Sequence, residues 1–139
     1  MPFRASHPVR FAACDAAGIA YYPKLFEICD GVIEDWTAEA LGVPRKVLHL
    51  EQGRALPTVD LRSTFERPAR LGDTLDMALA VRAVGTSSVD LELTADVDGT
   101  RCFTVAYRQV LMDMKSARSM PWPEEWRERL DARIEEGDA

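Results

Sequence analysis

Hydrophobic residues follow two different periods along the chain. From Leu25 onward they recur every three or four residues, which is typical of a helix with one buried face. This series consists of Leu25, Ile28, Cys29, Val32, Ile33, Trp36 and Ala40. Pro23 suits the first turn of such a helix, and Gly42 and Pro44 are a common signal for its end. The pattern predicts one long helix from near Pro23 to just before Gly42.

Downstream of this helix the period changes to two, which is typical of strands with one buried face. Four such runs are present, Val59 to Phe65, Leu75 to Val81, Val89 to Val97 and Phe103 to Leu111. Turn signals separate the last three runs, and Asp98-Gly99 is a dipeptide that tight hairpins prefer. We expect these three strands to form an antiparallel meander, preceded near the N-terminus by a first strand around Val9 and Phe11.

The order of elements predicts an α+β fold with a long central helix wrapped by a twisted antiparallel sheet, because a flat sheet could not cover that helix. A length of 139 residues suits a single domain over 1–139. Pro121 and Pro123 lead into a charged stretch, Glu124 to Glu135. We expect it to form a short C-terminal helical extension at about 121–136, attached as a surface appendage.

Charge and cysteine content exclude several classes of protein. The formal net charge of -6 disfavours nucleic-acid binding, which requires a basic face. Cys14, Cys29 and Cys102 are odd in number and widely spaced, so neither a disulfide framework nor a zinc site is indicated. There is no apolar signal core at the N-terminus and no apolar run of about 20 residues. We expect a soluble cytoplasmic protein that uses no metal or other cofactor and binds neither nucleic acid nor membrane.

Candidate chemistry is concentrated between Phe11 and Pro23. Asp15 lies a few residues before a glycine at position 18 and before the predicted helix start. We expect the free backbone amides of Gly18 to Tyr22 to crowd the positive end of the helix, where they can hold a developing oxyanion. A carboxylate beside such amides can serve as nucleophile or general base, although aspartate before glycine is also an ordinary turn former.

The same segment resembles a known family signature. It reads Phe-x-x-Cys-Asp-x-Ala-Gly-Ile-x-Tyr-Tyr-Pro from Phe11 to Pro23. This pattern resembles that of the 4-hydroxybenzoyl-CoA thioesterase-like branch of the hotdog-fold acyl-CoA thioesterases, and a looser similarity runs from about Val9 to Met112. The resemblance implies a hotdog fold and thioester hydrolysis. It also implies that Asp15 attacks the thioester or activates water, that the Tyr22 backbone N–H stabilises the oxyanion, and that Gly18 shapes the turn.

The resemblance also implies substrate-binding positions. Asp30 matches an aspartate that reads the ring hydroxyl in hydroxybenzoyl-CoA enzymes, although a solvated helix face shared with Glu27 and Glu34 is the alternative. Leu56 and Thr58 fall in the stretch that contributes to the substrate pocket. Leu56 stands where the family has a threonine, which favours a more apolar acyl group.

Candidates for holding the CoA phosphates are the loop from Val84 to Ser88 and three arginines, Arg67, Arg70 and Arg82. Related hotdog hydratases require a histidine at the position of Ala20, so hydratase activity is not expected. His7 and His49 lie in no nucleophile motif, which disfavours a Ser-His-Asp hydrolase.

The sequence therefore predicts an acyl-CoA thioesterase acting on an aromatic or medium-chain acyl group. Exposed sheet edges and the family both indicate a homodimer or homotetramer with the pocket at the subunit interface. Two alternatives stay open, a non-catalytic acyl-CoA-binding hotdog domain and a thioesterase acting on acyl carrier protein.

Overall fold

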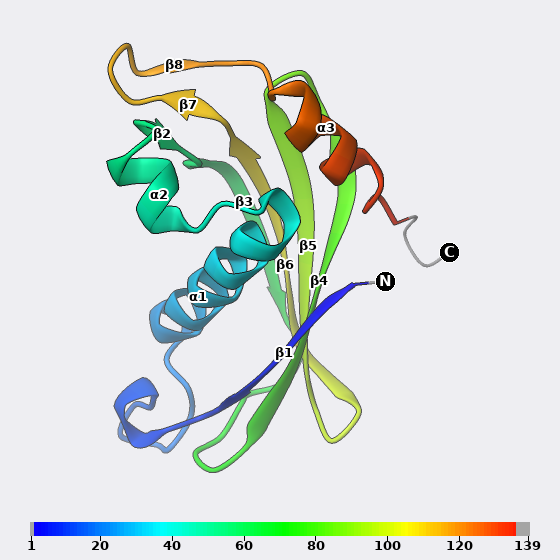
Figure 1. Ribbon diagram of the computed structural model, residues 1–139. Helices are drawn as coiled ribbons and strands as arrows, with labels where there is room; N and C mark the ends of the chain where they lie inside the picture. Colours follow the sequence, from blue (N-terminus) through cyan, green and yellow to red (C-terminus); the bar gives the residue numbers. More distant parts are fainter. Residues whose placement is uncertain (1, 136–139) are drawn as a thin grey trace.

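The computed structural model describes residues 2–135, in which a five-stranded antiparallel sheet curls around the long helix α1, Tyr22–Leu41 (Figure 1). The strand order is β1-β4-β5-β6-β3. The strands span Phe3–Pro8 (β1), Thr58–Phe65 (β3), Thr74–Val84 (β4), Ser88–Val97 (β5) and Thr100–Val110 (β6). The predicted α+β class, with a helix wrapped by a twisted sheet, is confirmed.

The meander of β4, β5 and β6 is also confirmed, since each strand pairs antiparallel with the next. Asp98 and Gly99 connect β5 to β6 with φ angles of 49° and 78°, the left-handed conformation that a two-residue hairpin of this kind requires. Both edges of the sheet, β1 and β3, pair on one side only.

Helix α1 begins and ends where the sequence predicts. Pro23 occupies its first turn, and Gly42 ends it with φ 71°, a left-handed conformation that glycine adopts without steric cost. Its buried face contains Cys29, Ile33 and Trp36, which pack into the core beneath the sheet. The helix therefore supplies one half of the core and the meander supplies the other.

The predicted position of the first strand is wrong. The strand ends at Pro8, while Val9 lies beyond it and Phe11 belongs to the 3-10 helix η1, Phe11–Ala13. Val9 is buried, and its backbone pairs with the turn before β4, whereas the Phe11 side chain is 80% exposed. Two apolar residues separated by one polar residue do not define a strand, and the paired segment upstream has only a weak hydrophobic pattern.

Several short elements were not predicted because they have fewer residues than a periodic pattern needs. Helix α2 spans Arg45–Leu50 and follows α1 directly. A small second sheet combines β2 (Arg54–Ala55), β7 (Met112–Asp113) and β8 (Arg118–Ser119). These elements cover the end of the molecule at which α1 terminates (Figure 1).

The C-terminal helix α3, Glu124–Asp131, is not a surface appendage, and that expectation is wrong. Trp122, Trp126 and Leu130 are buried in the hydrophobic core. The Trp122 indole N–H donates to the Ser88 carbonyl at 3.0 Å, so the segment is fixed to the start of β5. The segment is rich in charged residues, so its sequence did not indicate the apolar side that packs against the core. The expected extension reached residue 136, which lies outside the described residues.

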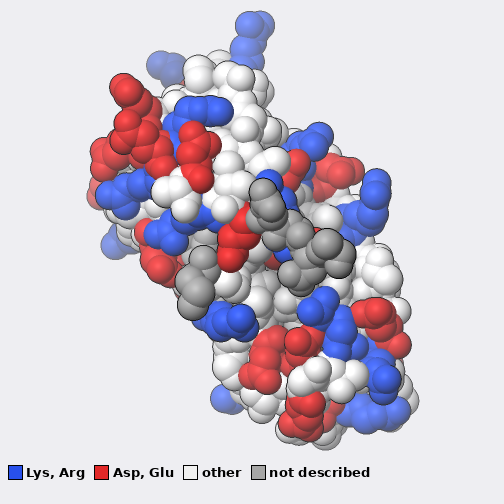
Figure 2. All heavy atoms as spheres, turned by 90° about the vertical axis from the view of Figure 1, so that its right-hand side faces the viewer, with Lys and Arg blue, Asp and Glu red and all other residues white. Residues whose placement is uncertain are grey.

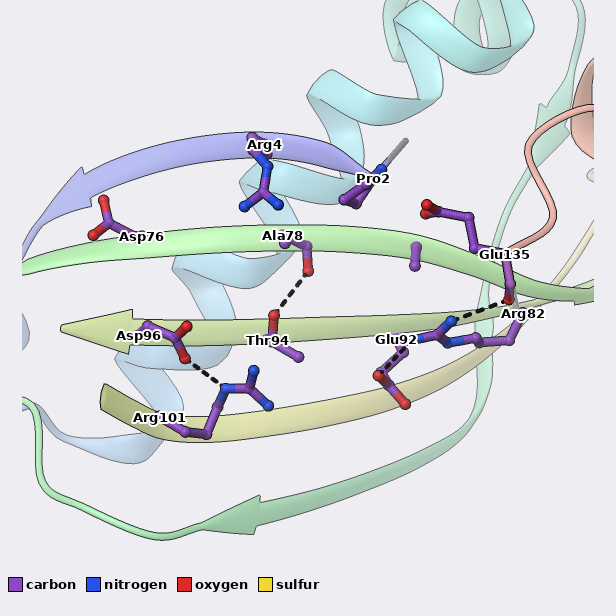
Figure 3. A pocket seen from close by; sticks show the side chains of 11 residues that line it. Pro2, Arg4, Asp76, Ala78, Arg82, Glu92, Thr94, Asp96, Arg101 and Glu135 are labelled. Carbon is purple, nitrogen blue, oxygen red and sulfur yellow. Dashed lines mark hydrogen bonds and ion pairs between the residues drawn. The ribbon is translucent and has the colours of Figure 1, made fainter. Parts of the chain in front are cut away.

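The outer face of the sheet, opposite α1, is polar. Figure 2 shows basic and acidic side chains interspersed on the side of the molecule that carries β1 and the C-terminal segment. A shallow cavity of about 360 Å³ on this face contains paired charges and small side chains (Figure 3). Arg82 pairs with Glu92 at 2.9 Å, and Arg101 pairs with Asp96. These two ion pairs neutralise four of the charged side chains that line the cavity.

No helix in the described part of the chain is both long and apolar enough to cross a bilayer.

Candidate active site

Asp15 lies in a tight loop that its own carboxylate holds together. Asp15 Oδ1 accepts hydrogen bonds from the backbone N–H groups of Ala17 at 2.8 Å and Ile19 at 3.3 Å. The Gly18 N–H donates to the Asp15 carbonyl, and Gly18 adopts φ 73°. Within the described residues no hydrogen bond reaches Asp15 Oδ2, and the residue is exposed. One carboxylate oxygen is therefore structural, and the other is available to water or a ligand.

The expectation of free amides from Gly18 to Tyr22 is wrong for four of the five. The N–H groups of Gly18 to Tyr21 all donate within the loop or to a neighbouring segment. Among the described residues only the Tyr22 N–H of this group has no acceptor. It stands at the first position of α1, where the helix dipole adds positive potential. The structure thus leaves one donor in place of a row of donors.

A cavity of about 320 Å³ opens beside Tyr22. Ile19 and Leu25 contribute apolar walls, while Phe65 and Arg67 reach it from the end of β3 and the loop that follows. The loop is held against the Asp15 segment by backbone hydrogen bonds, including Ala20 N–H to the Ala69 carbonyl at 2.8 Å. Segments far apart in the sequence therefore meet at the start of α1.

A row of aromatic rings borders this cavity at Tyr22 and Phe65 and continues into the core at Phe103. The ring centroids of Tyr22 and Phe26 lie 5.9 Å apart, those of Phe26 and Phe65 6.1 Å, and those of Phe65 and Phe103 5.8 Å. These distances are typical of favourable aromatic contacts. Phe26 and Phe65 were not assigned to the site from the sequence, although Phe26 follows Tyr22 at a four-residue helical spacing that places both on one face.

The side chains along the open side of α1 and the inner face of β3 form what we call the α1–β3 edge. Its members are Tyr22, Phe26 and Asp30 on α1, and Thr58, Leu61 and Phe65 on β3. Leu61 is 43% exposed and Phe65 is 47% exposed, although their cross-strand neighbours Tyr107 and Phe103 are buried. The edge therefore leaves apolar surface uncovered next to the cavity.

Asp30 lies toward this edge. Its charge acts on Cys29 and Tyr107, which are buried between α1 and β6, and on Arg45 at the start of α2. Glu27, in contrast, pairs with Lys24 at 3.4 Å on the side of α1 that faces β1. Asp30 and Glu27 are thus separated, and the possible role of Asp30 in substrate recognition stays a prediction.

Burial dominates the ionisation of the groups near Asp30. Burial raises the pKa of the Cys29 thiol to about 12, with the neighbouring Tyr107 hydroxyl acting in the opposite direction. Burial also raises the pKa of Tyr107 and lowers that of Arg45, the latter opposed by Asp30 and Glu34. Cys29 is therefore a protonated, unreactive thiol at neutral pH.

The two predicted substrate residues before and within β3 occupy different environments. Leu56 is 4% exposed and packs in the core. Thr58 is exposed at the start of β3, where its Oγ1 accepts a hydrogen bond from Gln109 Nε2 at 3.3 Å. Gln109 was not singled out from the sequence, although it is a polar residue on the buried period of β6, which is a detectable signal. The binding roles of Leu56 and Thr58 stay predictions.

The candidates for phosphate binding are separated in space. The loop after β4 lies next to α3, at the end of the molecule opposite the Asp15 loop (Figure 1). Its Gly85 carbonyl accepts a hydrogen bond from Arg127 at 2.7 Å. Arg82 belongs to the outer face of the sheet, whereas Arg67 lines the cavity beside Tyr22. Arg70 forms an isolated antiparallel bridge with Ile19 in the Asp15 loop, so Arg67 and Arg70 are the two basic candidates that lie near the start of α1.

Across residues 2–135, no group of three or more His, Cys, Asp or Glu side chains is arranged to hold a metal ion.

Comparison with known proteins gives a consistent assignment. A family model described as the thioesterase-like superfamily matches residues 9–130. A 1,4-dihydroxy-2-naphthoyl-CoA hydrolase of Nostoc punctiforme is 27% identical over 125 residues, covering 90% of this chain and 84% of the relative.

Solved structures share the fold. A thioesterase-superfamily structure from Jannaschia sp. CCS1 is 26% identical, with a TM-score of 0.88 over 96% of this chain and 94% of the other. The Staphylococcus aureus protein SAV2348, solved in complex with CoA, is 17% identical, with a TM-score of 0.90 over 100% of this chain and 89% of the other. The arrangement of one long helix and a five-stranded antiparallel sheet is that of the hotdog fold.

Proposed function

The chain belongs to the thioesterase-like superfamily and is a thioester hydrolase with the hotdog fold, and we propose that it hydrolyses an aromatic acyl-CoA with Asp15 as the catalytic carboxylate. The observation that carries this proposal is that the loop leading into α1 contains both an Asp15 carboxylate with one oxygen, Oδ2, that accepts no hydrogen bond from the described residues and a Tyr22 N–H without an acceptor among them. The aromatic row beside them supports an aromatic acyl group, and the Nostoc punctiforme relative is named for such a substrate.

The chemistry needs two functions from the protein. A carboxylate must attack the thioester carbonyl or remove a proton from the attacking water, and a donor must stabilise the negative charge that develops on the carbonyl oxygen. Asp15 Oδ2 supplies the first function. The Tyr22 N–H at the positive end of α1 supplies the second. When water attacks, loss of the CoA thiolate gives the free acid directly; when Asp15 attacks, it gives a mixed anhydride on Asp15, which water then hydrolyses to the free acid.

Binding of the rest of the substrate follows from the same placement. Phe26 and Phe65 offer ring faces to an aromatic acyl group. Asp30 farther along α1 accepts a hydrogen bond from a ring hydroxyl. Arg67 at the cavity mouth supplies positive charge to the CoA phosphates, locally against the net charge of -6.

We also propose that a second copy of the chain covers the α1–β3 edge. Within residues 2–135, β3 pairs with β6 on one side and with no strand on the other, and exposed strand edges readily pair with another chain. The exposed apolar side chains of Val59, Leu61 and Phe65 would be covered by such pairing. The acyl group would then lie between two subunits, in a homodimer or a homotetramer of two such dimers.

The test of catalysis is Asp15→Asn. The asparagine side-chain oxygen can still accept the hydrogen bonds from Ala17 and Ile19, so the loop and the melting temperature should be retained. Turnover of acyl-CoA should fall about 100-fold or more, the usual loss for a positioned acid or base. Asp73→Asn is a matched control, because Asp73 Oδ2 accepts the Arg70 N–H at 2.8 Å in the neighbouring turn.

Near-wild-type hydrolysis by Asp15→Asn would contradict the proposed role. Absence of any acyl-CoA hydrolysis by the wild type, together with saturable acyl-CoA binding, would instead favour the non-catalytic binding domain. Light scattering tests the assembly, since a strictly monomeric and fully active protein would refute a pocket shared between subunits.

A further inference from the structure

Glu66 places a second carboxylate at the start of α1. It follows Phe65, the last residue of β3, and lines the cavity of about 320 Å³ that opens beside Tyr22. Among the described residues that line this cavity, Glu66 is the one that carries a carboxylate. The reaction as described above does not use it.

Backbone hydrogen bonds fix the position of Glu66. Its N–H donates to the Cys102 carbonyl at 2.8 Å, and the N–H of Arg67 donates to the same oxygen at 3.1 Å. These bonds anchor the end of β3 to β6, because Cys102 belongs to that strand. The Glu66 side chain is exposed and has no hydrogen bond or ion pair in the described part of the chain. Its backbone is therefore held in place, while its carboxylate is available to water or a ligand.

Asp15 and Glu66 lie on two loops that are joined directly. The Ile19 N–H donates to Asp15 Oδ1 at 3.3 Å, and Ile19 also lines the cavity. The backbone of Ile19 pairs with Arg70 in an isolated antiparallel bridge, which ties the Asp15 loop to the loop that begins at Glu66. Asp15 thus adjoins the Ile19 wall, whereas Glu66 lines the cavity itself.

A nucleophilic aspartate needs a second group to complete the reaction. Attack of Asp15 on the thioester releases the CoA thiolate and leaves a mixed anhydride, in which an Asp15 oxygen is bonded to the acyl carbon. Asp15 then has no free carboxylate with which to remove a proton from the water that must cleave the anhydride. A positioned general base accelerates such a step about 100-fold to 10,000-fold.

We propose that Glu66 is a catalytic residue, the general base that activates water for hydrolysis of the anhydride on Asp15. This inference rests on the proposed function and adds to it the nucleophilic route and the base for its second step. Water in the cavity gives a proton to Glu66 while its oxygen bonds to the acyl carbon. The bond from that carbon to the Asp15 oxygen breaks, which releases the free acid and restores the Asp15 carboxylate. Because Glu66 is exposed, it then passes the proton to bulk solvent.

Rapid-quench measurement of the first turnover separates the two steps. Each protein is mixed with benzoyl-CoA or 4-hydroxybenzoyl-CoA, whichever the wild type hydrolyses faster, and the released CoA is quantified. In Glu66→Gln, close to one equivalent of CoA per active site should appear at about the wild-type rate, followed by turnover slowed about 100-fold or more. Asp15→Asn should show no such burst, because it forms no anhydride.

Glu27→Gln is the matched control. Glu27 is an exposed carboxylate near the same helix start, but it lies on the side of α1 that faces β1 and pairs with Lys24. This control should leave kcat unchanged. Glu66→Gln should keep the melting temperature, since the Glu66 side chain makes no hydrogen bond or ion pair with the described residues. Glu66→Asp, which retains a carboxylate, should recover part of the lost turnover.

The failures of this inference and of the proposed function are distinguishable. A kcat of Glu66→Gln within about threefold of the wild type would overturn the role of Glu66 and leave the proposed function intact. A slow Glu66→Gln variant without a CoA burst would also overturn it, because Glu66 would then act during thioester cleavage. If the wild type hydrolyses neither substrate, or Asp15→Asn keeps near-wild-type turnover, the proposed function itself fails.

Discussion

The unpaired N–H of Tyr22 allows the oxyanion donor to be removed without disturbing the fold. Tyr22→Pro deletes this N–H at a helix position where proline is tolerated. No hydrogen bond is lost, since the group has no acceptor among the described residues. Tyr21 already has an extended backbone, with φ -79° and ψ 126°, which suits a residue before proline. Tyr22→Pro also removes the tyrosine ring. The control Tyr22→Ala removes the ring but keeps the N–H, so the difference between the two variants reports the N–H alone.

The expected magnitude follows from the number of donors. Among the amides of Gly18 to Tyr22, only that of Tyr22 is free to bind the oxyanion. Removing it should therefore lower kcat by the amount typical of one oxyanion donor, about 100-fold to 1,000-fold, or about 3–4 kcal/mol. Tyr22→Ala should lose much less, because the ring is 57% exposed and the ring contacts that it makes in the described part of the chain are with Tyr21 and Phe26. Both variants should melt within a few degrees of each other.

The assay is steady-state hydrolysis of an aromatic acyl-CoA, followed by the absorbance of the thioester so that protein thiols do not contribute. The relevant quantity is the ratio of kcat between the two variants. If Tyr22→Pro retains kcat within about threefold of Tyr22→Ala, the amide is not the oxyanion donor, and the assignment of the start of α1 as the catalytic centre is refuted.

Two further predictions concern stability. The pKa of Cys29 is raised to about 12 in the folded state from about 8.5 unfolded, so its contribution is complete below about pH 8.5 and is lost as the pH rises toward 12. The free energy of unfolding, measured in urea between pH 9 and 10, should fall with pH more steeply in the wild type than in Cys29→Ala, by up to about 1.4 kcal/mol per pH unit. Equal slopes in the two proteins would contradict the buried thiol. Trp126→Ala should lower the free energy of unfolding by about 3–5 kcal/mol, as expected for a buried aromatic residue, whereas a change below about 0.5 kcal/mol would mean that α3 is not part of the core.

The sequence by itself determined the elements that are long and strongly periodic. The three-and-four spacing between Leu25 and Ala40 defined α1, and its end at Gly42 followed from local backbone preference. The period of two defined β3 to β6, and Asp98-Gly99 defined the hairpin between the last two. These features depend on interactions within a few residues, so they can be read locally. The loop at Asp15 was recognised through a dense motif, whereas its exact hydrogen bonds were not.

Only the tertiary structure decided which side chains face one another and which backbone N–H groups have a hydrogen-bond acceptor. The amides of Gly18 to Tyr21 are occupied because partners such as Ala69 arrive from a distant loop. The helix α3 joins the core because its apolar stripe meets the open end of the sheet, which its charged composition concealed. The buried Gln109 side chain donates a hydrogen bond to Thr58, which lies 51 positions away in the sequence. Such pairings depend on the register of the strands and on the packing of the sheet around α1, and no local pattern encodes them.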